Sequence, residues 1–253
     1  VPVTLVTGYL GTGKTTLLRH IILSITDKVG KISGAGGKLR LAIVMNEFGR
    51  IPIDGKVVEG KGIRVAELSG GCVCCSMSGE FQAAMEELIS LAKPDWIVVE
   101  TTGLAEPSTL AHDISENMSN VRLDSIVTVV DADALAKSPN IGHTGMEQIT
   151  LADLILLNKM DLIQKKTLKE IRDGLARANP HALIIETKDC AVEPEVIFGM
   201  ERREGAKIQI SKHGSHEPDL DCFDFTIDAK LDHEGFLEFL KNMPKGIYRS
   251  KGF

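Results

Sequence analysis

The stretch Gly8-Tyr9-Leu10-Gly11-Thr12-Gly13-Lys14-Thr15 follows the pattern G-x-x-x-x-G-K-[ST] of a phosphate-binding loop. The apolar run Val3–Val6 before it predicts a buried strand, and Thr16–Ile25 after it has the apolar spacing of a helix. A strand, a glycine-rich turn and a helix are the setting that this motif requires. We therefore expect an α/β fold of the P-loop NTPase type, with a mainly parallel sheet flanked by helices.

The residue types of this loop explain how it would hold a nucleotide. Its glycines let backbone N–H groups turn toward phosphate oxygens, and the helix that follows adds the positive end of its dipole. Lys14 can reach the β- and γ-phosphates, and the Thr15 hydroxyl can bind Mg²⁺. The candidate ligands of the phosphates and Mg²⁺ are Gly8, Gly11, Thr12, Gly13, Lys14, Thr15 and Thr16, with Lys14 also a candidate catalytic residue.

Apolar runs and helical spacings alternate along the rest of the first 200 residues. Further strands are predicted at Leu39–Met45, Ile63–Leu68, Asp95–Val99, Val121–Val130, Leu154–Leu157 and Ala182–Ile185, and helices at Ser78–Leu91, Pro107–Ile114 and Gln164–Ala178. Strands that alternate with helices indicate a parallel sheet, whose carboxyl edge is where such folds bind ligands.

Polar residues follow two of these predicted strands. Glu100 ends the strand at 95–99 and can hold Mg²⁺ through a water, so it is a second candidate catalytic residue. Gly103 can donate its backbone N–H to the γ-phosphate. Glu47 and Asp54 follow the strand at 39–45 and can contact Mg²⁺ or the attacking water, which makes Asp54 a third catalytic candidate. The alternative for Glu47 and Asp54 is a pair of solvated loop carboxylates.

Asn158-Lys159-Met160-Asp161 forms an N-K-x-D motif at the end of another predicted strand. The Asp161 carboxylate can accept hydrogen bonds from the N1–H and amino groups of guanine, which adenine lacks in that arrangement. The Asn158 amide can donate to the purine, and the Lys159 stem can cover the base. Thr187 lies where a second base-contacting loop is expected. Four residues alone are weak evidence, but after a P-loop and at a strand end they favour GTP.

Three cysteines crowd into Gly70-Gly71-Cys72-Val73-Cys74-Cys75. Thiolates favour Zn²⁺ and Cu(I) and also bind Co²⁺, and three ligands leave a fourth position open, as in a transfer site. Small buried cysteines beside a strand end are the alternative, and the crowding favours ligands. We expect the isolated Cys190 and Cys222 to be simply buried.

The bulk properties of the 253 residues exclude several classes of protein. A formal net charge of −6 provides no basic excess for nucleic acid. No apolar run is long enough to span a membrane, and the cysteine usage fits a reducing, cytoplasmic setting. The expected organisation is a GTPase domain over 1–200, a polar linker over 201–220 and the beginning of a further domain over 221–253, with a helix at Asp232–Leu240 capped by Asp232.

In this order the P-loop, Asn46-Glu47-Phe48-Gly49, Gly71–Cys75, Glu100-Thr101-Thr102-Gly103 and the N-K-x-D motif resemble CobW-type GTPases, which are related to urease and hydrogenase accessory proteins. The Cys-x-Cys-Cys motif is the most specific part, because generic GTPases lack it. The resemblance implies a C-terminal domain, with Tyr248–Phe253 as an early strand. Compared with the family pattern that domain is cut short, a histidine-rich tract is reduced to His213 and His216, and Lys28–Lys38 is longer.

The resemblance implies a GTPase that carries Zn²⁺ or Co²⁺ to a client protein. We expect Cys72, Cys74 and Cys75 to be the metal ligands, with Glu47 or a water as the fourth. Two alternatives are nickel insertion, as in the accessory GTPases, and a GTP-binding metal sensor without useful turnover. The sequence leaves open whether the protein is a monomer or a homodimer that depends on nucleotide or metal.

Overall fold

The structure is a computed structural model that describes residues 1–27, 39–45, 63–67, 78–200, 202 and 232–243. The chain divides into two compact units, Val1–Asp219 and Leu220–Phe253. The first unit contains a seven-stranded sheet, and the second contains a single described helix.

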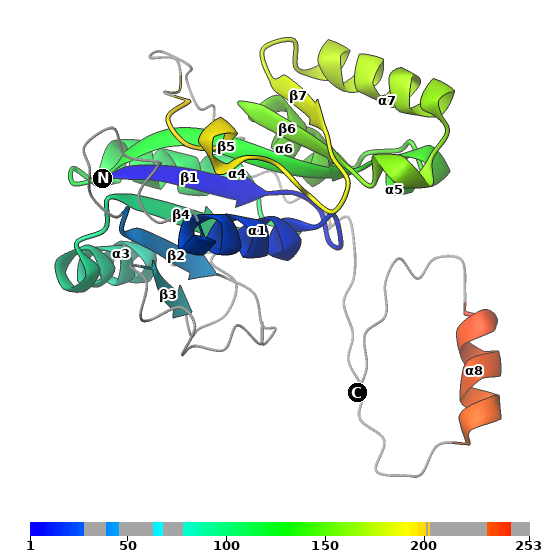
Figure 1. The fold of residues 1–253 in the computed structure, drawn as a ribbon, viewed down its shortest axis with the longest axis horizontal. Helices are drawn as coiled ribbons and strands as arrows, with labels where there is room; N and C mark the ends of the chain where they lie inside the picture. The colour runs from blue at the N-terminus through cyan, green and yellow to red at the C-terminus, as the bar shows by residue number, and fades with distance from the viewer. Residues whose placement is uncertain (28–38, 46–62, 68–77, 201, 203–231, 244–253) are drawn as a thin grey trace. The chain divides into compact units, whose positions relative to one another are not determined.

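The sheet of the first unit has the strand order β3-β2-β4-β1-β5-β6-β7, and every neighbouring pair is parallel (Figure 1). Its strands are β1 Pro2–Thr7, β2 Leu41–Met45, β3 Ile63–Glu67, β4 Trp96–Glu100, β5 Arg122–Asp131, β6 Leu154–Asn158 and β7 Leu183–Glu186. The predicted α/β class and parallel sheet are confirmed. Because β1 lies between β4 and β5, the loop that follows β1 lies at the middle of the carboxyl edge of the sheet.

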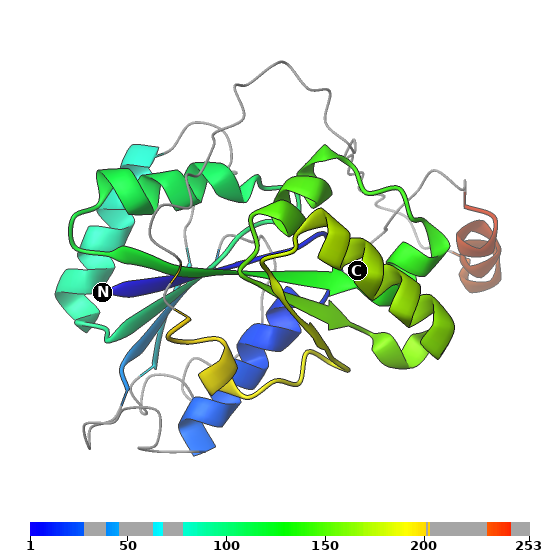
Figure 2. The ribbon, with the colours of Figure 1, turned by 90° about the horizontal axis from the view of Figure 1, so that it is seen from above.

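Helices cover both faces of the sheet (Figure 2). The helices of the first unit are α1 Lys14–Asp27, α3 Ser78–Ala92, α4 Pro107–His112, α5 Ala132–Lys137, α6 His143–Thr150 and α7 Lys165–Ala178. A π-helical turn over Asp113–Asn117 extends α4, and 3₁₀ turns occupy Met160–Leu162 and Pro194–Val196. None of the described helices is long and apolar enough to cross a lipid bilayer.

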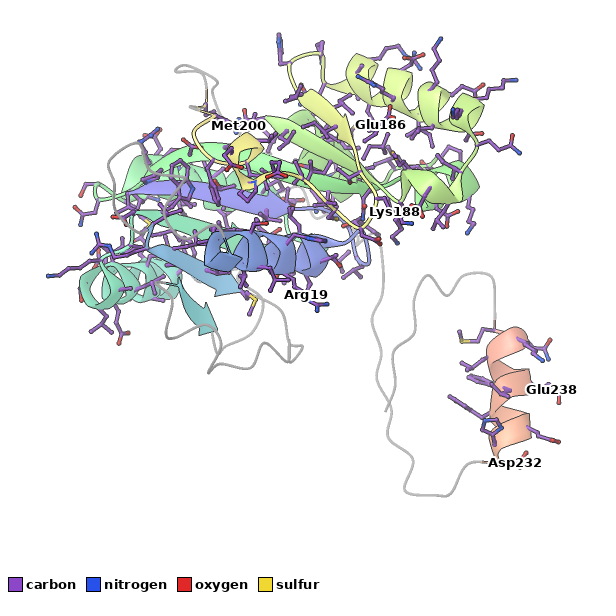
Figure 3. The ribbon with its side chains drawn as sticks, viewed as in Figure 1. Arg19, Glu186, Lys188, Met200, Asp232 and Glu238 are labelled. Atoms are coloured by element: carbon purple, nitrogen blue, oxygen red, sulfur yellow. The ribbon has the colours of Figure 1, made fainter. Side chains whose placement is uncertain are left out.

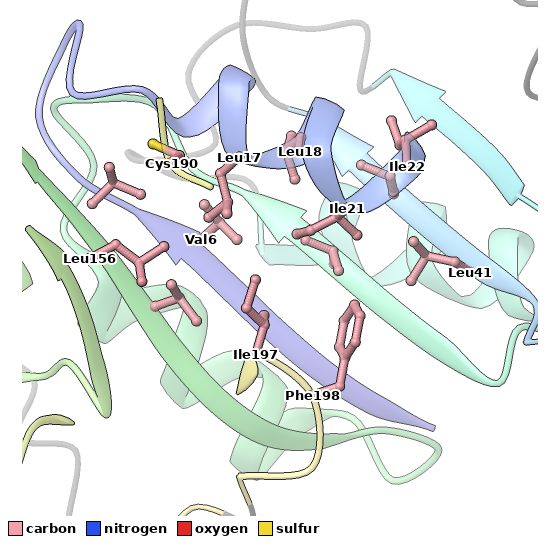
Figure 4. Close-up of a cluster of buried hydrophobic side chains, with 14 of the residues drawn as sticks. Val6, Leu17, Leu18, Ile21, Ile22, Leu41, Leu156, Cys190, Ile197 and Phe198 are labelled. Carbon is pink, nitrogen blue, oxygen red and sulfur yellow. The ribbon is translucent and has the colours of Figure 1, made fainter. Parts of the chain in front are cut away.

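Hydrophobic core residues lie on both faces of the sheet, because successive residues of a strand point to opposite faces. Leu154 and Leu156 of β6 pack with α1 on one face, and Ile155 and Leu157 pack with α6 and α7 on the other. Helix α1 contributes a stripe at helical spacing, with buried Leu17, Leu18, Ile21 and Ile22 (Figure 4). Ile25 of the same helix is also buried. Helices α3 and α4 pack on the face opposite α1, against β1, β2 and β4.

Three details differ from the sequence predictions. Helix α1 begins at Lys14 rather than Thr16, because its first hydrogen bond runs from the Leu17 N–H to the carbonyl of Gly13 within the loop. Helices α5 and α6 were not predicted, since six and eight residues are too few for a clear periodicity.

The second unit contains α8, His233–Lys241. The side chain of Asp232 accepts a hydrogen bond from the Gly235 N–H at 2.7 Å, which confirms the predicted N-cap (Figure 3). The strand expected at Tyr248–Phe253 lies outside the described residues, as do Cys222, His213 and His216.

Candidate nucleotide-binding site

The loop between β1 and α1 has a backbone that only glycine can adopt at two of its positions. Gly8 has a φ of +137°, and a Cβ there would lie 2.3 Å from the carbonyl oxygen of Val129. Gly13 has a φ of +118°, and a Cβ there would lie 2.7 Å from both Asn158 Nδ2 and Cys190 Sγ. The glycines therefore allow both the turn and its close contact with β5 and with the segments after β6 and β7.

The Lys14 side chain folds back over this loop. Its Nζ donates to the carbonyl oxygens of Gly8 at 2.9 Å and Tyr9 at 3.2 Å, and the residue is only 5% exposed. The Thr12 hydroxyl also donates to the Tyr9 carbonyl, at 3.0 Å. The ammonium group is therefore held at the loop itself, within a short movement of any phosphate that the loop would bind.

Thr15 and Glu100 lie together at the amino end of α1. The Thr15 hydroxyl donates to Glu100 Oε1 at 3.4 Å, and Glu100 is 2% exposed at the end of β4, in register with Val6 of β1. A hydroxyl and a carboxylate are oxygen ligands of the kind that Mg²⁺ prefers. The pair predicted to hold Mg²⁺ is thus brought together, whereas Thr16 lies one residue further along α1 and is exposed.

The segment after β4 packs directly on the P-loop. A Cβ at Gly103 would lie 2.6 to 2.7 Å from the side chain and backbone nitrogen of Leu10. The buried Gln148 of α6 holds this segment from the other side, because its Nε2 donates to the carbonyls of Gly103 and Ala105, each at 3.2 Å. Sequence reasoning missed Gln148, because it lies in the unpredicted α6.

Asn158 connects the P-loop to the segment after β7. Its Nδ2 donates to the Thr12 carbonyl at 2.9 Å, and its Oδ1 accepts from the Cys190 N–H at 2.9 Å and the Thr187 hydroxyl at 3.2 Å. Asn158 and Thr187 are each 2% exposed. Both residues were predicted as base ligands. In the structure their side chains are hydrogen-bonded to each other, and that of Asn158 also bonds to backbone groups of Thr12 and Cys190.

Lys159 adopts a left-handed backbone conformation, with a φ of +62°, and reaches toward the P-loop. Its Nζ donates to the Gly11 carbonyl at 3.0 Å and forms an ion pair with Asp131 Oδ2. Asp131 ends β5, in register with Asn158, and its Oδ1 accepts from Ala134 N at 3.0 Å to cap α5. Asp131 belongs to no motif, and sequence reasoning missed it, although an aspartate at the end of a predicted strand was a signal that could have found it.

Asp161 lies beside Lys188 on the same edge of the sheet. Its Oδ2 is 3.6 Å from Lys188 Nζ, just beyond the end of β7 (Figure 3), and the carboxyl side chain is 35% exposed. Unlike Asn158 and Thr187, Asp161 keeps a solvent-accessible carboxylate that a base could reach.

Cys190 is fully buried, as predicted, and its contacts place it beneath the P-loop (Figure 4). Its Sγ donates to the Gly13 carbonyl at 3.3 Å. Burial, together with the neighbouring carboxylate of Asp189, raises the pKa of the Cys190 thiol to about 12. The thiol is therefore neutral at physiological pH and acts as a small packing group.

Several predicted site residues lie outside the described residues, namely Glu47, Asp54, Cys72, Cys74 and Cys75. The strands that precede those residues in the chain are described. Met45 at the end of β2 is in register with Glu67 at the end of β3 and with Glu100. The three strand ends therefore lie side by side at the edge that carries Thr15 and Glu100.

A parallel sheet with a phosphate loop in its middle, a buried lysine and an adjoining hydroxyl–carboxylate pair defines a P-loop nucleotide-binding protein. Comparison with known proteins gives the family, because residues 2–186 match the model described as CobW/HypB/UreG, nucleotide-binding domain. The chain belongs to the CobW/HypB/UreG family.

Individual relatives agree with this assignment. A zinc chaperone CobW from a Sinorhizobium species is 32% identical over an alignment 299 residues long, which covers 100% of this chain and 81% of that protein. The zinc chaperone YjiA of Escherichia coli is 32% identical over 208 residues, which cover 78% of this chain and 61% of YjiA. The chain thus spans less than two thirds of the length of YjiA.

Two solved structures resemble the fold. The Zn(II)-bound YjiA GTPase from Escherichia coli superposes with a TM-score of 0.58 at 25% identity, covering 79% of this chain and 62% of that one. The hydrogenase maturation factor HypB from Archaeoglobus fulgidus gives a TM-score of 0.53 at 20% identity, covering 74% of this chain and 81% of that one, and shows the fold alone.

Proposed function

We propose that the protein is a GTP-hydrolysing metallochaperone that binds Zn²⁺ through Cys72, Cys74 and Cys75 and delivers it to a client protein. The observation that carries this proposal is the register of β2, β3 and β4. The carboxyl ends of these three strands lie side by side at the edge that holds Thr15 and Glu100, and the cysteine segment follows β3 in the chain. The names of two relatives, zinc chaperone CobW and zinc chaperone YjiA, favour zinc over cobalt and nickel.

For the nucleotide, we assign the phosphates to the backbone N–H groups of residues 8–16 and to Lys14. Since the Lys14 ammonium already lies on the loop carbonyls, it only has to exchange those acceptors for β- and γ-phosphate oxygens. Thr15 and Glu100 would hold Mg²⁺, with Glu100 acting through a water, and the ion would neutralise charge that develops on the phosphates. Gly103 would donate to the γ-phosphate, and Asp54 would orient the attacking water.

For the base, we assign guanine recognition to the exposed carboxylate of Asp161. Asn158, Lys159 and Thr187 would support it by joining its loop to the P-loop. We therefore expect Asp161→Asn to weaken GTP binding and to improve binding of xanthosine triphosphate, whose C2 oxygen replaces the amino group. Asp173→Asn, at an exposed position of α7, is the matched control and should leave both affinities unchanged. Equal calorimetric affinity of the unmodified protein for ATP and GTP would contradict the assignment.

For the metal, the three thiolates would leave a fourth position to Glu47 or a water, the open arrangement of a transfer site. The GTPase domain would occupy residues 1–200, followed by a linker over 201–220 and the beginning of a C-terminal domain over 221–253. Thiolate ligands also imply a reducing compartment such as the cytoplasm.

The decisive measurement is a competition titration of Zn²⁺ in the presence of Mg²⁺ with either GDP or a non-hydrolysable GTP analogue. If the nucleotide orders the loops that follow β2, β3 and β4, zinc affinity should differ between the two states by about 5- to 150-fold, the usual range of coupling between two sites. By linkage, Zn²⁺ should change the affinity for the GTP analogue by the same factor. Equal zinc affinity in the two states, or unchanged affinity after all three cysteines are replaced by alanine, would refute the mechanism.

A further inference from the structure

Three metal-ligating side chains that are not part of the cysteine segment come together. Glu106 lies just before α4, in the segment that follows Gly103, while His143 and Glu147 lie one turn apart on α6. A carboxylate oxygen from each glutamate and a ring nitrogen of His143 all lie within 4.8 Å of one another, and His143 Nδ1 is 3.7 Å from Glu106 Oε1. Residues at i and i+4 share one face of a helix, so α6 presents His143 and Glu147 together.

One carboxylate oxygen of Glu147 accepts a hydrogen bond, and the other has no partner among the described residues. Its Oε1 accepts a hydrogen bond from the Ser108 N–H at 3.2 Å, which fixes the carboxylate against α4. Its Oε2 is buried and accepts no hydrogen bond from any described residue. A buried carboxylate oxygen without a partner is unfavourable, and a bound cation would remove that cost.

We propose that Glu106, His143 and Glu147 form a binding site for a divalent transition-metal ion, with Zn²⁺ as the best fit, separate from the cysteine segment. An imidazole with two carboxylates is a ligand set that suits Zn²⁺ better than Mg²⁺, which prefers oxygen alone. Ligand atoms around tetrahedral zinc lie about 3.3 to 3.6 Å apart, given bonds of about 2.0 to 2.2 Å. The three ligand atoms therefore need to approach one another by at most about 1.5 Å, which rotations about their χ angles can supply.

An ion at this site would connect two elements that border the nucleotide site. Glu106 lies three residues after Gly103, and Gln148, the neighbour of Glu147, already holds the carbonyls of Gly103 and Ala105. The ion would therefore add a direct link between α6 and the segment that carries Gly103. This site uses none of the cysteines, so the inference does not depend on the proposed function.

The test is a zinc titration of the full chain carrying Cys72→Ala, Cys74→Ala and Cys75→Ala, without nucleotide, against a competing chromophoric chelator. We expect this parent variant to bind Zn²⁺, and the further changes His143→Ala and Glu147→Gln to remove one zinc equivalent per chain. The matched control is His112→Ala with Glu116→Gln, a histidine and a glutamate at the same spacing beside α4, which should keep that equivalent. No binding by the parent, or equal loss in the two double variants, would overturn the proposal.

Two further measurements keep the outcome decisive if the double variant folds poorly by circular dichroism. The single change Glu106→Gln replaces a surface carboxylate and should weaken zinc binding at least about tenfold if Glu106 is a ligand. In the parent, Zn²⁺ should shift the imidazole nitrogen resonances of His143 in NMR spectra and slow amide hydrogen exchange over residues 101–106. Unshifted His143 resonances at saturating Zn²⁺ would also overturn the proposal.

Discussion

Replacing Asn158 by alanine should destabilise the protein more than any other single change in the N-K-x-D motif. The amide makes three hydrogen bonds, to the Thr12 carbonyl, the Cys190 N–H and the Thr187 hydroxyl, at a residue that is 2% exposed. The Thr187 hydroxyl can rotate toward another acceptor. The carbonyl of Thr12 and the N–H of Cys190 belong to the backbone and cannot easily turn elsewhere.

The magnitude follows from those three bonds. Each net hydrogen bond contributes about 1 kcal/mol, and a buried backbone group left without a partner costs about 1 to 3 kcal/mol. Asn158→Ala leaves two such backbone groups and also loses the bond to Thr187, so it should lower the free energy of unfolding by about 3 to 7 kcal/mol. It should also weaken nucleotide binding, because the P-loop carbonyl that Asn158 holds would be released.

The assay is guanidinium unfolding without nucleotide, followed by tryptophan fluorescence. Trp96 is the single tryptophan of the chain, and it reports on the sheet because its Nε1 donates to Thr4 Oγ1 at 3.0 Å and its ring packs edge-on against Phe198. The control is Asn117→Ala. This exposed asparagine donates a hydrogen bond from its amide to Asp113 Oδ1, and the change should cost less than about 1 kcal/mol. A loss below about 1 kcal/mol for Asn158→Ala, at an unchanged denaturant slope, would refute the reasoning.

Three other changes test neighbouring parts of the site. Gly13→Ala should cost at least about 2 kcal/mol of stability in the same unfolding assay, because its φ is +118° and the new Cβ would meet Cys190 Sγ at 2.7 Å. The control Gly79→Ala has open space around its new Cβ and should cost less than about 1 kcal/mol. The pKa of Cys190 is raised to about 12, against 9.0 for an ordinary thiol. Between about pH 9 and 12 the unfolded chain therefore binds fewer protons than the folded chain. In that window the free energy of unfolding should fall by up to about 1.4 kcal/mol per pH unit. This contribution should be absent from the pH dependence of Cys190→Ala, and identical slopes would show that the thiol does not titrate as inferred. Asp131→Asn keeps the α5 cap but removes the ion pair to Lys159, so it should cost about 1 kcal/mol, and Asp131→Ala should cost about 1 kcal/mol more through loss of the cap. Equal stability of the two Asp131 variants would contradict the capping contribution.

Much of the fold could be predicted from sequence because β1, β2, β4, β5 and β6 are buried on both faces. Such strands appear as continuous apolar runs, and each of the seven was placed within a few residues; β5, for example, spans Arg122–Asp131 against a prediction of Val121–Val130. The order of the strands could not be predicted, because it depends on which side of β1 each crossover passes. Helices α5 and α6 were missed because one or two turns carry too few apolar positions.

The candidate site was predicted best where a motif fixes the backbone and worst where a side chain acts through another residue. Lys14 and Thr15 lie as the P-loop motif requires, and Thr15 meets Glu100 across 85 residues of sequence. Asp131 and Gln148 were missed, because their contacts with Lys159 and Gly103 exist only once β5, β6 and α6 are assembled. The N-K-x-D pattern also indicated direct contact of Asn158 with a base. In the structure the three hydrogen bonds of Asn158 join the P-loop to the segment after β7.

The central place of β1 in the sheet has a consequence for how this protein could diversify. The strands that precede Asp131, Asn158 and Thr187 all lie on one side of β1, whereas β2, β3 and β4, which precede Glu47, Cys72 and Gly103, lie on the other. The residues proposed to recognise the base and those proposed to bind the metal therefore follow strands on separate halves of the sheet, with β1 and the P-loop between them. Under that proposal, substitutions that change metal preference need not touch the strands that support base recognition.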